Sequence, residues 1–174
     1  MENKTTLGKL IACMDNGKHC ADSISMVHNT CGNLKQLMSV YFFFIRECTR
    51  KDFPSLEFMR TELGESMQPW GGFIDANGEI EALKRMAFLG SCNCNLTTSL
   101  YNIHQCWVRH DSQLELRVTE HSHVYIDCFE HSKVIVHALS NDCKVVIEQY
   151  GDSSVTIDGE VGCVAVIKHN CQTY

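Results

Sequence analysis

The residues of this chain best suited to chemistry are thiols and imidazoles between positions 92 and 110. They are Cys92, Cys94, His104, Cys106 and His110. Zinc binds four sulfur or nitrogen donors at tetrahedral positions, commonly supplied as closely spaced pairs. The C-x-C and H-x-C pairs have the spacing of a strand, so both members of a pair can share one face. These residues are candidate zinc ligands; the alternative is that the thiols are small core hydrophobes, as free cysteines often are.

A second group of thiols and imidazoles near the N-terminus supports a weaker hypothesis of the same kind. Its members are Cys13, His19, Cys20, His28 and Cys31. Apart from a possible zinc ion, the sequence predicts no cofactor.

The His-Ser pairs at 121–122 and 131–132 resemble parts of a nucleophilic site. Such catalysis requires the imidazole to bond the serine while a third group orients the imidazole. Adjacent residues at a turn seldom meet that requirement, and two copies at one position of a repeat indicate a structural role. The chain also lacks phosphate-binding, nucleophile-elbow and metalloprotease motifs. We therefore expect a protein that is not an enzyme.

Both His-Ser pairs lie in the stretch from Asp111 to Asn170, through which a unit of about ten residues recurs. Each unit opens with a small polar pair suited to a tight turn, such as Asp111-Ser112. Apolar residues then alternate strictly with polar ones, which predicts a strand with one buried face. The inward set is Leu114, Leu116, Val118, Val124, Ile126, Cys128, Val134, Val136, Ala138, Val145, Ile147, Val155, Ile157, Val164 and Val166.

Two chain paths fit a unit of one strand and one turn. In a flattened β-solenoid, two units form one coil and alternate units stack. In an antiparallel meander or sandwich, each unit pairs with the next, usually through Asn-Gly or Asp-Gly turns that this stretch lacks. The constant register favours stacking. The extra Asn141 and the shortened last unit depart from the strict period, so the prediction of regular stacking is weakest at these two places.

The recurring pattern [D/H/N]-S-x-Φ-x-Φ, where Φ is apolar, resembles the ten-residue β-solenoid repeats of many uncharacterised bacterial and phage proteins. The resemblance covers the last third of the chain. It implies an architecture and a possible phage or mobile-element origin, and it brings no catalytic residues.

A two-unit coil would bring outward residues of alternate units into columns. The predicted columns are Arg117–His137–Asp158, Asp127–Glu148 and Tyr125–Val146–Ala165. Like charges one strand spacing apart repel, bind a cation or shift a pKa, so Asp127 and Glu148 are a cation candidate; solvated carboxylates are the alternative. The apolar column predicts a partner surface, and burial under the helical domain is the alternative.

The first 87 residues predict an α-helical domain. The expected helices run from Thr5 to Met14, His19 to Asn29, Cys31 to Cys48, Leu56 to Leu63 and Glu79 to Ala87, with a loop over Gly64 to Gly72. Composition changes near Phe88, so we place the boundary there: a helical domain at 1–87 and a β-repeat domain at 88–174 that starts with degenerate units. The expected fold class is α+β.

Charge and composition limit the possible partners. The net charge is −6, and the stretch from Asp111 to Asn170 carries ten acids against four bases. Nucleic-acid binding usually requires a basic patch, so nucleic acid is not expected. The longest apolar run, Val40 to Ile45, is too short to cross a bilayer. Eleven cysteines without a recognisable secretion signal predict reduced thiols in a cytoplasmic protein.

These observations predict a non-enzymatic interaction or assembly protein that binds a protein partner or forms a homo-oligomer. The alternative is a small-ligand or metal-binding protein whose site lies at the domain junction, around Cys92 to His110.

Overall fold

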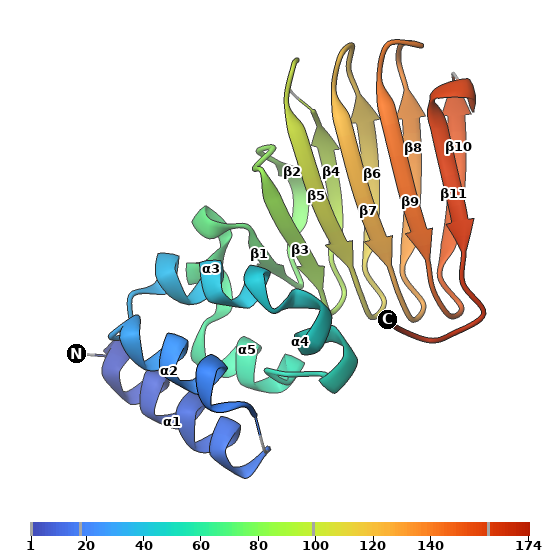
Figure 1. The fold of residues 1–174 in the computed structure, drawn as a ribbon. Coiled ribbons are helices and arrows are strands. Elements are labelled where there is room, and N and C mark those ends of the chain that lie inside the picture. Colours follow the sequence, from blue (N-terminus) through green and yellow to red (C-terminus); the bar gives the residue numbers. More distant parts are fainter. Residues whose placement is uncertain (1, 18, 99, 160) are drawn as a thin grey trace. The chain divides into compact units, whose positions relative to one another are not determined.

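The computed structural model describes residues 2–17, 19–98, 100–159 and 161–174 (Figure 1). It contains two compact units, Met1–Trp70 and Gly71–Tyr174. The first is helical and the second is built of strands. The sequence predicted the boundary between helices and strands near Phe88. In the structure this boundary lies earlier in the chain, because the first strands precede Phe88.

The helical unit contains five α-helices followed by a 3₁₀ helix among its described residues. These are α1 (Glu2–Asn16), α2 (Ala21–Asn29), α3 (Leu34–Phe43), α4 (Ile45–Lys51), α5 (Leu56–Glu62) and η1 (Gly64–Trp70). Side chains of Asn33 and Ser55 accept hydrogen bonds from the first turns of α3 and α5, as N-cap residues do. Leu10, Met14 and Val27 form a core between α1 and α2.

The single helix predicted over Cys31 to Cys48 is wrong, because the chain breaks at Phe44 into α3 and α4. Phe44 leaves the helical conformation at φ −100° and ψ 19°. Phe42 and Ile45, on either side of the break, are both buried, whereas Phe43 is exposed. The loop predicted over Gly64 to Gly72 is also wrong in part, because Gly64–Trp70 forms η1.

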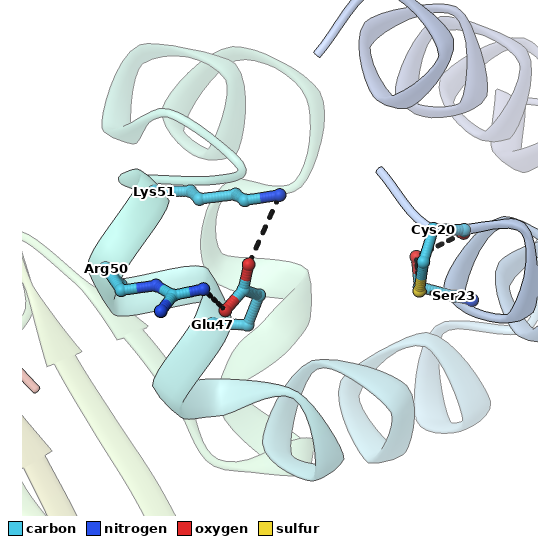
Figure 2. Close-up of polar contacts among 5 residues, drawn as sticks. All are labelled: Cys20, Ser23, Glu47, Arg50 and Lys51. Atoms are coloured by element: carbon cyan, nitrogen blue, oxygen red, sulfur yellow. Dashed lines mark hydrogen bonds and ion pairs between the residues drawn. The ribbon is translucent and has the colours of Figure 1, made fainter. Parts of the chain in front are cut away.

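Two local polar arrangements hold helix ends in this unit (Figure 2). Cys20 is the N-cap of α2, and its sulfur accepts a hydrogen bond from the Ser23 amide at 3.4 Å. On α4, Glu47 accepts hydrogen bonds from Arg50 and Lys51, the latter at 3.2 Å. Neither arrangement involves residues far apart in sequence.

The second unit is a flattened β-solenoid, as the repeat predicted, and the meander alternative is wrong. Sheet A has the strand order β1-β3-β5-β7-β9-β11, and sheet B has the order β10-β8-β6-β4-β2. Every pairing is parallel and joins strands that are two apart in sequence order (Figure 1). The strands are β1 (Gly72–Ile74), β2 (Asn77–Ile80), β3 (Arg85–Leu89), β4 (Asn93–Thr97), β5 (Ile103–Val108), β6 (Gln113–Val118), β7 (His123–Cys128), β8 (Lys133–Ala138), β9 (Lys144–Gln149), β10 (Ser154–Gly159) and β11 (Val164–Lys168).

The predicted inward face is confirmed from β6 to β9. Ile126 and Ile147 stack in register, and both side chains lie in the core between the two sheets. In β10 and β11 the inward residues Val155, Val164 and Val166 pack against this core. These three and Ile157 are only partly buried. The burial of the alternating residues therefore decreases at the last coil.

The helix predicted over Glu79 to Ala87 is wrong, because this segment forms β2 and β3. Ile80, Leu83 and Ala87 have helical spacing, yet Met86 and Phe88 alternate as in a strand and are buried. Phe88 stacks on Phe73 of β1 with ring centroids 5.2 Å apart. Packing against the neighbouring coils decides the conformation where local spacing is ambiguous.

The small polar pairs that open alternate repeat units, such as Asp111-Ser112, lie at the corners where the chain passes from sheet A to sheet B. Gly90, His110, Glu130 and Gly151 occupy the left-handed region at these corners. Two buried serines at these corners bond to backbone carbonyls: Ser112 Oγ donates to Gly90 O at 3.1 Å, and Ser153 Oγ donates to Cys128 O at 3.2 Å. The extra Asn141 lies in the turn between β8 and β9, and the register of β9 on β7 is kept.

Candidate functional site

The predicted zinc ligands do not converge on one point. Cys92, Cys94 and Cys106 are buried in the core. Burial, with a further contribution from Asp127, raises the pKa of Cys106 to about 12, so this thiol stays protonated. Across the described ranges, no three His, Cys, Asp or Glu side chains are grouped so as to hold a metal ion.

The two histidines of this set have other contacts. His104 points inward, and its Nδ1 lies 2.9 Å from Leu83 O. His110 lies at a corner, where its Nδ1 accepts a hydrogen bond from the Gly90 amide at 3.1 Å. Both imidazoles thus contact backbone groups of the preceding coil, which is a structural use of histidine.

The N-terminal thiols are also separate from one another in their contacts. Cys13, Cys20 and Cys31 are exposed. Hydrogen bonds with the Ser23 side chain and with the Ser23 amide hold the pKa of Cys20 below its ordinary value. Cys20 therefore acts as a helix cap with enhanced thiolate character.

The outward column predicted for Arg117, His137 and Asp158 is present on sheet B. His137 Nδ1 lies 3.0 Å from Asp158 Oδ2, and His137 Nε2 lies 3.2 Å from Glu115 Oε1. Arg117 also contacts Glu115, at 3.9 Å. The outer face of sheet B is thus a polar surface that pairs its own charges.

The outer face of sheet A carries the predicted apolar column of Tyr125, Val146 and Ala165, each in register with the next. Tyr125 is 41% exposed. Two further exposed side chains on this face, Ile103 and Ile167, are 54% and 44% exposed. We call these five residues the sheet A strip. The sequence analysis did not include Ile103 and Ile167. Ile167 occupies an outward position of its alternation, whereas Ile103 precedes the stretch in which that alternation was drawn.

The predicted acidic column is present, and each carboxylate has its own polar partner. Asp127 and Glu148 are in register on β7 and β9. The Tyr174 hydroxyl donates to Asp127 Oδ2, and the His169 imidazole contacts Glu148 Oε2. Trp107 Nε1 donates in turn to the Tyr174 oxygen at 3.0 Å. These partners reduce the repulsion that would otherwise favour a cation between the two carboxylates.

The sequence analysis missed the aromatic column that holds Tyr174 in place. Phe129, Tyr150 and His169 follow β7, β9 and β11 at equivalent positions, and their rings stack with centroids 4.8 and 4.3 Å apart. Tyr174 meets Phe129 and Tyr150 edge to face. Burial and the Asp127 charge raise the pKa of Tyr174, so its hydroxyl remains a donor. The recurrence of rings at one repeat position was the signal available in the sequence.

A charged pair lies one coil earlier at the same corner. The buried Arg109 guanidinium, 3% exposed, lies 2.7 Å from Glu130 Oε1. Burial alone would raise the pKa of Glu130, but the charge and hydrogen bond of Arg109, together with His110, hold that pKa below its ordinary value. The pair therefore ties two successive corners together in its ionised form.

Searches against protein-family models, curated proteins and solved structures found no match to this chain. The fold by itself defines a β-solenoid repeat protein with a helical unit. Within the described part of the chain, no helix has the length and apolar character needed to cross a membrane.

Proposed function

We propose that this protein is a non-enzymatic interaction protein whose β-solenoid binds a protein partner through the sheet A strip. The observation that carries the proposal is the strip itself: the column Tyr125–Val146–Ala165 has Ile167 beside it on β11 and Ile103 diagonal to Tyr125 on β5. Scattered exposed apolar residues are ordinary, whereas a contiguous apolar patch with a polar surround is typical of a binding surface.

The composition of the strip supports a protein partner. Tyr125 supplies a large ring with a polar tip, which is typical of interface centres. Charged groups flank it, including Asp127 on its own strand and Lys144 on the next. An apolar centre with a charged surround is the usual anatomy of a protein interface.

The rigidity of the scaffold also supports the proposal. Each strip residue lies on a strand whose inward neighbours pack in the core, such as Ile126 and Ile147. A surface fixed in this way loses little conformational entropy on binding, so more of the contact energy is realised as affinity. No grouping among the described residues favours the small-ligand or metal-binding alternative.

The test is affinity capture from native host cells with the full chain, followed by quantitative mass spectrometry. The informative variant is Tyr125→Glu, which places a charge in the strip. The matched control is Ile135→Glu, an equivalent outward change on β8 of sheet B. We expect at least one protein captured by the wild type to be reduced by about tenfold or more with Tyr125→Glu and unaffected by Ile135→Glu.

Direct binding of that protein to the purified chain must reproduce the difference. The proposal is wrong if the two variants capture the same proteins at wild-type levels. Thermal unfolding of both variants confirms that a loss of capture does not reflect a loss of folding.

A further inference from the structure

The last coil of the solenoid, formed by β10 and β11, differs from the coils before it. Val155 and Ile157 of β10 and Val164 and Val166 of β11 point inward but are only partly buried. Val134 and Val136, in register with the two β10 residues, are buried to 1% or less exposure. The apolar interior of the solenoid is therefore open at this end.

The backbone of the same coil is also unpaired on its open side. Ser154 N donates to Ser132 O at 2.9 Å, and His169 N donates to Gln149 O at 2.9 Å, so outward residues direct their amides to the preceding coil. Because successive residues of a strand alternate, the amides and carbonyls of Val155, Ile157 and Val166 point the other way, as does the carbonyl of Val164. The Val164 amide closes the last turn of the 3₁₀ helix η2 (Val161–Cys163). In the described chain, β10 pairs with β8 alone and β11 with β9 alone.

This end has few of the features that prevent edge pairing. Prolines, bulges and inward charges usually protect exposed strand edges. Neither β10 nor β11 contains proline. Lys168 is at an inward register position, but it is the last residue of β11, beyond the apolar pair. The aromatic column and Tyr174 lie at the corner, on Phe129 and Tyr150, and pair with neither edge strand.

We propose that the open coil of β10 and β11 is a self-association surface on which a second copy of this chain docks end to end by antiparallel strand pairing. The occupant must supply two strand edges about 10 Å apart and an apolar interior between them. A single peptide strand would pair with one edge and leave the interior in water. The matching end of another copy meets both requirements at once.

Symmetry sets the geometry of this contact. Homodimers commonly form around a two-fold axis that brings the same surface of each copy together. A two-fold axis perpendicular to the solenoid axis reverses the strand direction, so each new pair is antiparallel. The hydrogen-bonded ladders of both sheets then continue from one copy into the other, while the sheet A strip of each copy remains on an outer face.

The size of the surface predicts a reversible dimer. A strand of six residues is about 20 Å long, and the two sheets are about 10 Å apart. This contact is smaller than the roughly 800 Å² per partner that stable complexes usually bury. We therefore expect association that depends on concentration over the micromolar range.

The test uses analytical ultracentrifugation of the full chain over a concentration series. The wild type should change from monomer to dimer as its concentration rises. Ile157→Lys places a charge in the joined interior and should weaken association by at least about tenfold. Thr156→Lys, the neighbouring exposed residue that points outward, is the matched control and should associate like the wild type.

A second measurement keeps the proposal testable if Ile157→Lys fails to fold. Hydrogen exchange of the wild type at low and high concentration should show amide protection gained at Val155, Ile157 and Val166 in the dimer. A wild type that remains monomeric throughout overturns the proposal. So does a dimer that Tyr125→Glu disrupts and Ile157→Lys leaves intact, because the sheet A strip would then be the contact.

Discussion

The outer faces of the two sheets share one core, one register and one repeat, yet their surfaces differ. Sheet B presents polar contacts centred on His137, and Ile135 is the one apolar side chain at its described outward positions. Sheet A presents the sheet A strip, and Tyr174 and His169 are partners of its acidic residues. Because the stacking is the same, the fold does not require the difference. It is a difference in what each face can bind.

The most severe test of this comparison changes neighbouring residues on opposite sides of β9. Ile147→Asp should unfold the solenoid, because an unpaired charge in the dry core costs on the order of 5 kcal/mol. Val146→Asp, one residue earlier and outward, should change the free energy of unfolding by less than about 1 kcal/mol. Chemical denaturation of both variants measures this. Equal destabilisation would show that sheet A is as buried outside as inside.

The corner between the two faces should give the next largest effect. Glu130→Gln leaves the buried Arg109 without its carboxylate and should cost about 1–3 kcal/mol at pH 7, allowing for the partial exposure of Glu130. The folded-state pKa of Glu130 is lowered, so its stabilisation is present above the unfolded pKa and is lost as the pH falls through the folded one.

Thermal unfolding of Glu130→Gln and wild type between pH 7 and pH 3 measures that dependence. The difference in melting temperature should shrink as the solution is acidified. A difference that stays constant over this range would mean that the ionised carboxylate of Glu130 contributes nothing specific to the corner.

Removal of one hydroxyl tests the polar part of sheet A. Tyr174→Phe deletes the group that links Trp107 to Asp127 and should lower the free energy of unfolding by about 1–2 kcal/mol. The ring still packs against Phe129 and Tyr150, so the change isolates the hydrogen bonds. Chemical denaturation measures the loss, and an altered Trp107 fluorescence should accompany it. Unchanged stability and fluorescence would contradict the described contact.

The smallest effect should come from sheet B. His137→Ala removes polar contacts to Glu115 and to the well-exposed Asp158. Exposed pairs are weak and are screened by salt, so we expect a change below about 1 kcal/mol that decreases further at high ionic strength. Urea denaturation at low and high salt provides the measurement. A larger, salt-independent loss would indicate that sheet B depends on its surface charges for stability.

Residue spacing predicted the structure correctly where the sequence repeats and less well where it does not. From Asp111 onward, alternation with a constant period predicted the inward residues, and stacking of alternate units predicted the outward columns, including Tyr125–Val146–Ala165 and Arg117–His137–Asp158. Before Phe88 no repeat is evident, and local spacing alone misassigned β2 and β3 to a helix. Short segments fit both periods, so only their packing decides between them.

The sequence by itself therefore favoured the solenoid over a meander and predicted its inward register and the outward columns of the repeat, because similar units can stack in few ways. The parallel strand pairing of the structure excluded the meander. The tertiary structure decided which side chains meet across turns and over long separations. It separated the thiols and imidazoles that resembled a zinc site, and it placed Tyr174 on Asp127 and Trp107. Such contacts depend on the path of a segment that follows no period, and residue spacing carries no information about that path.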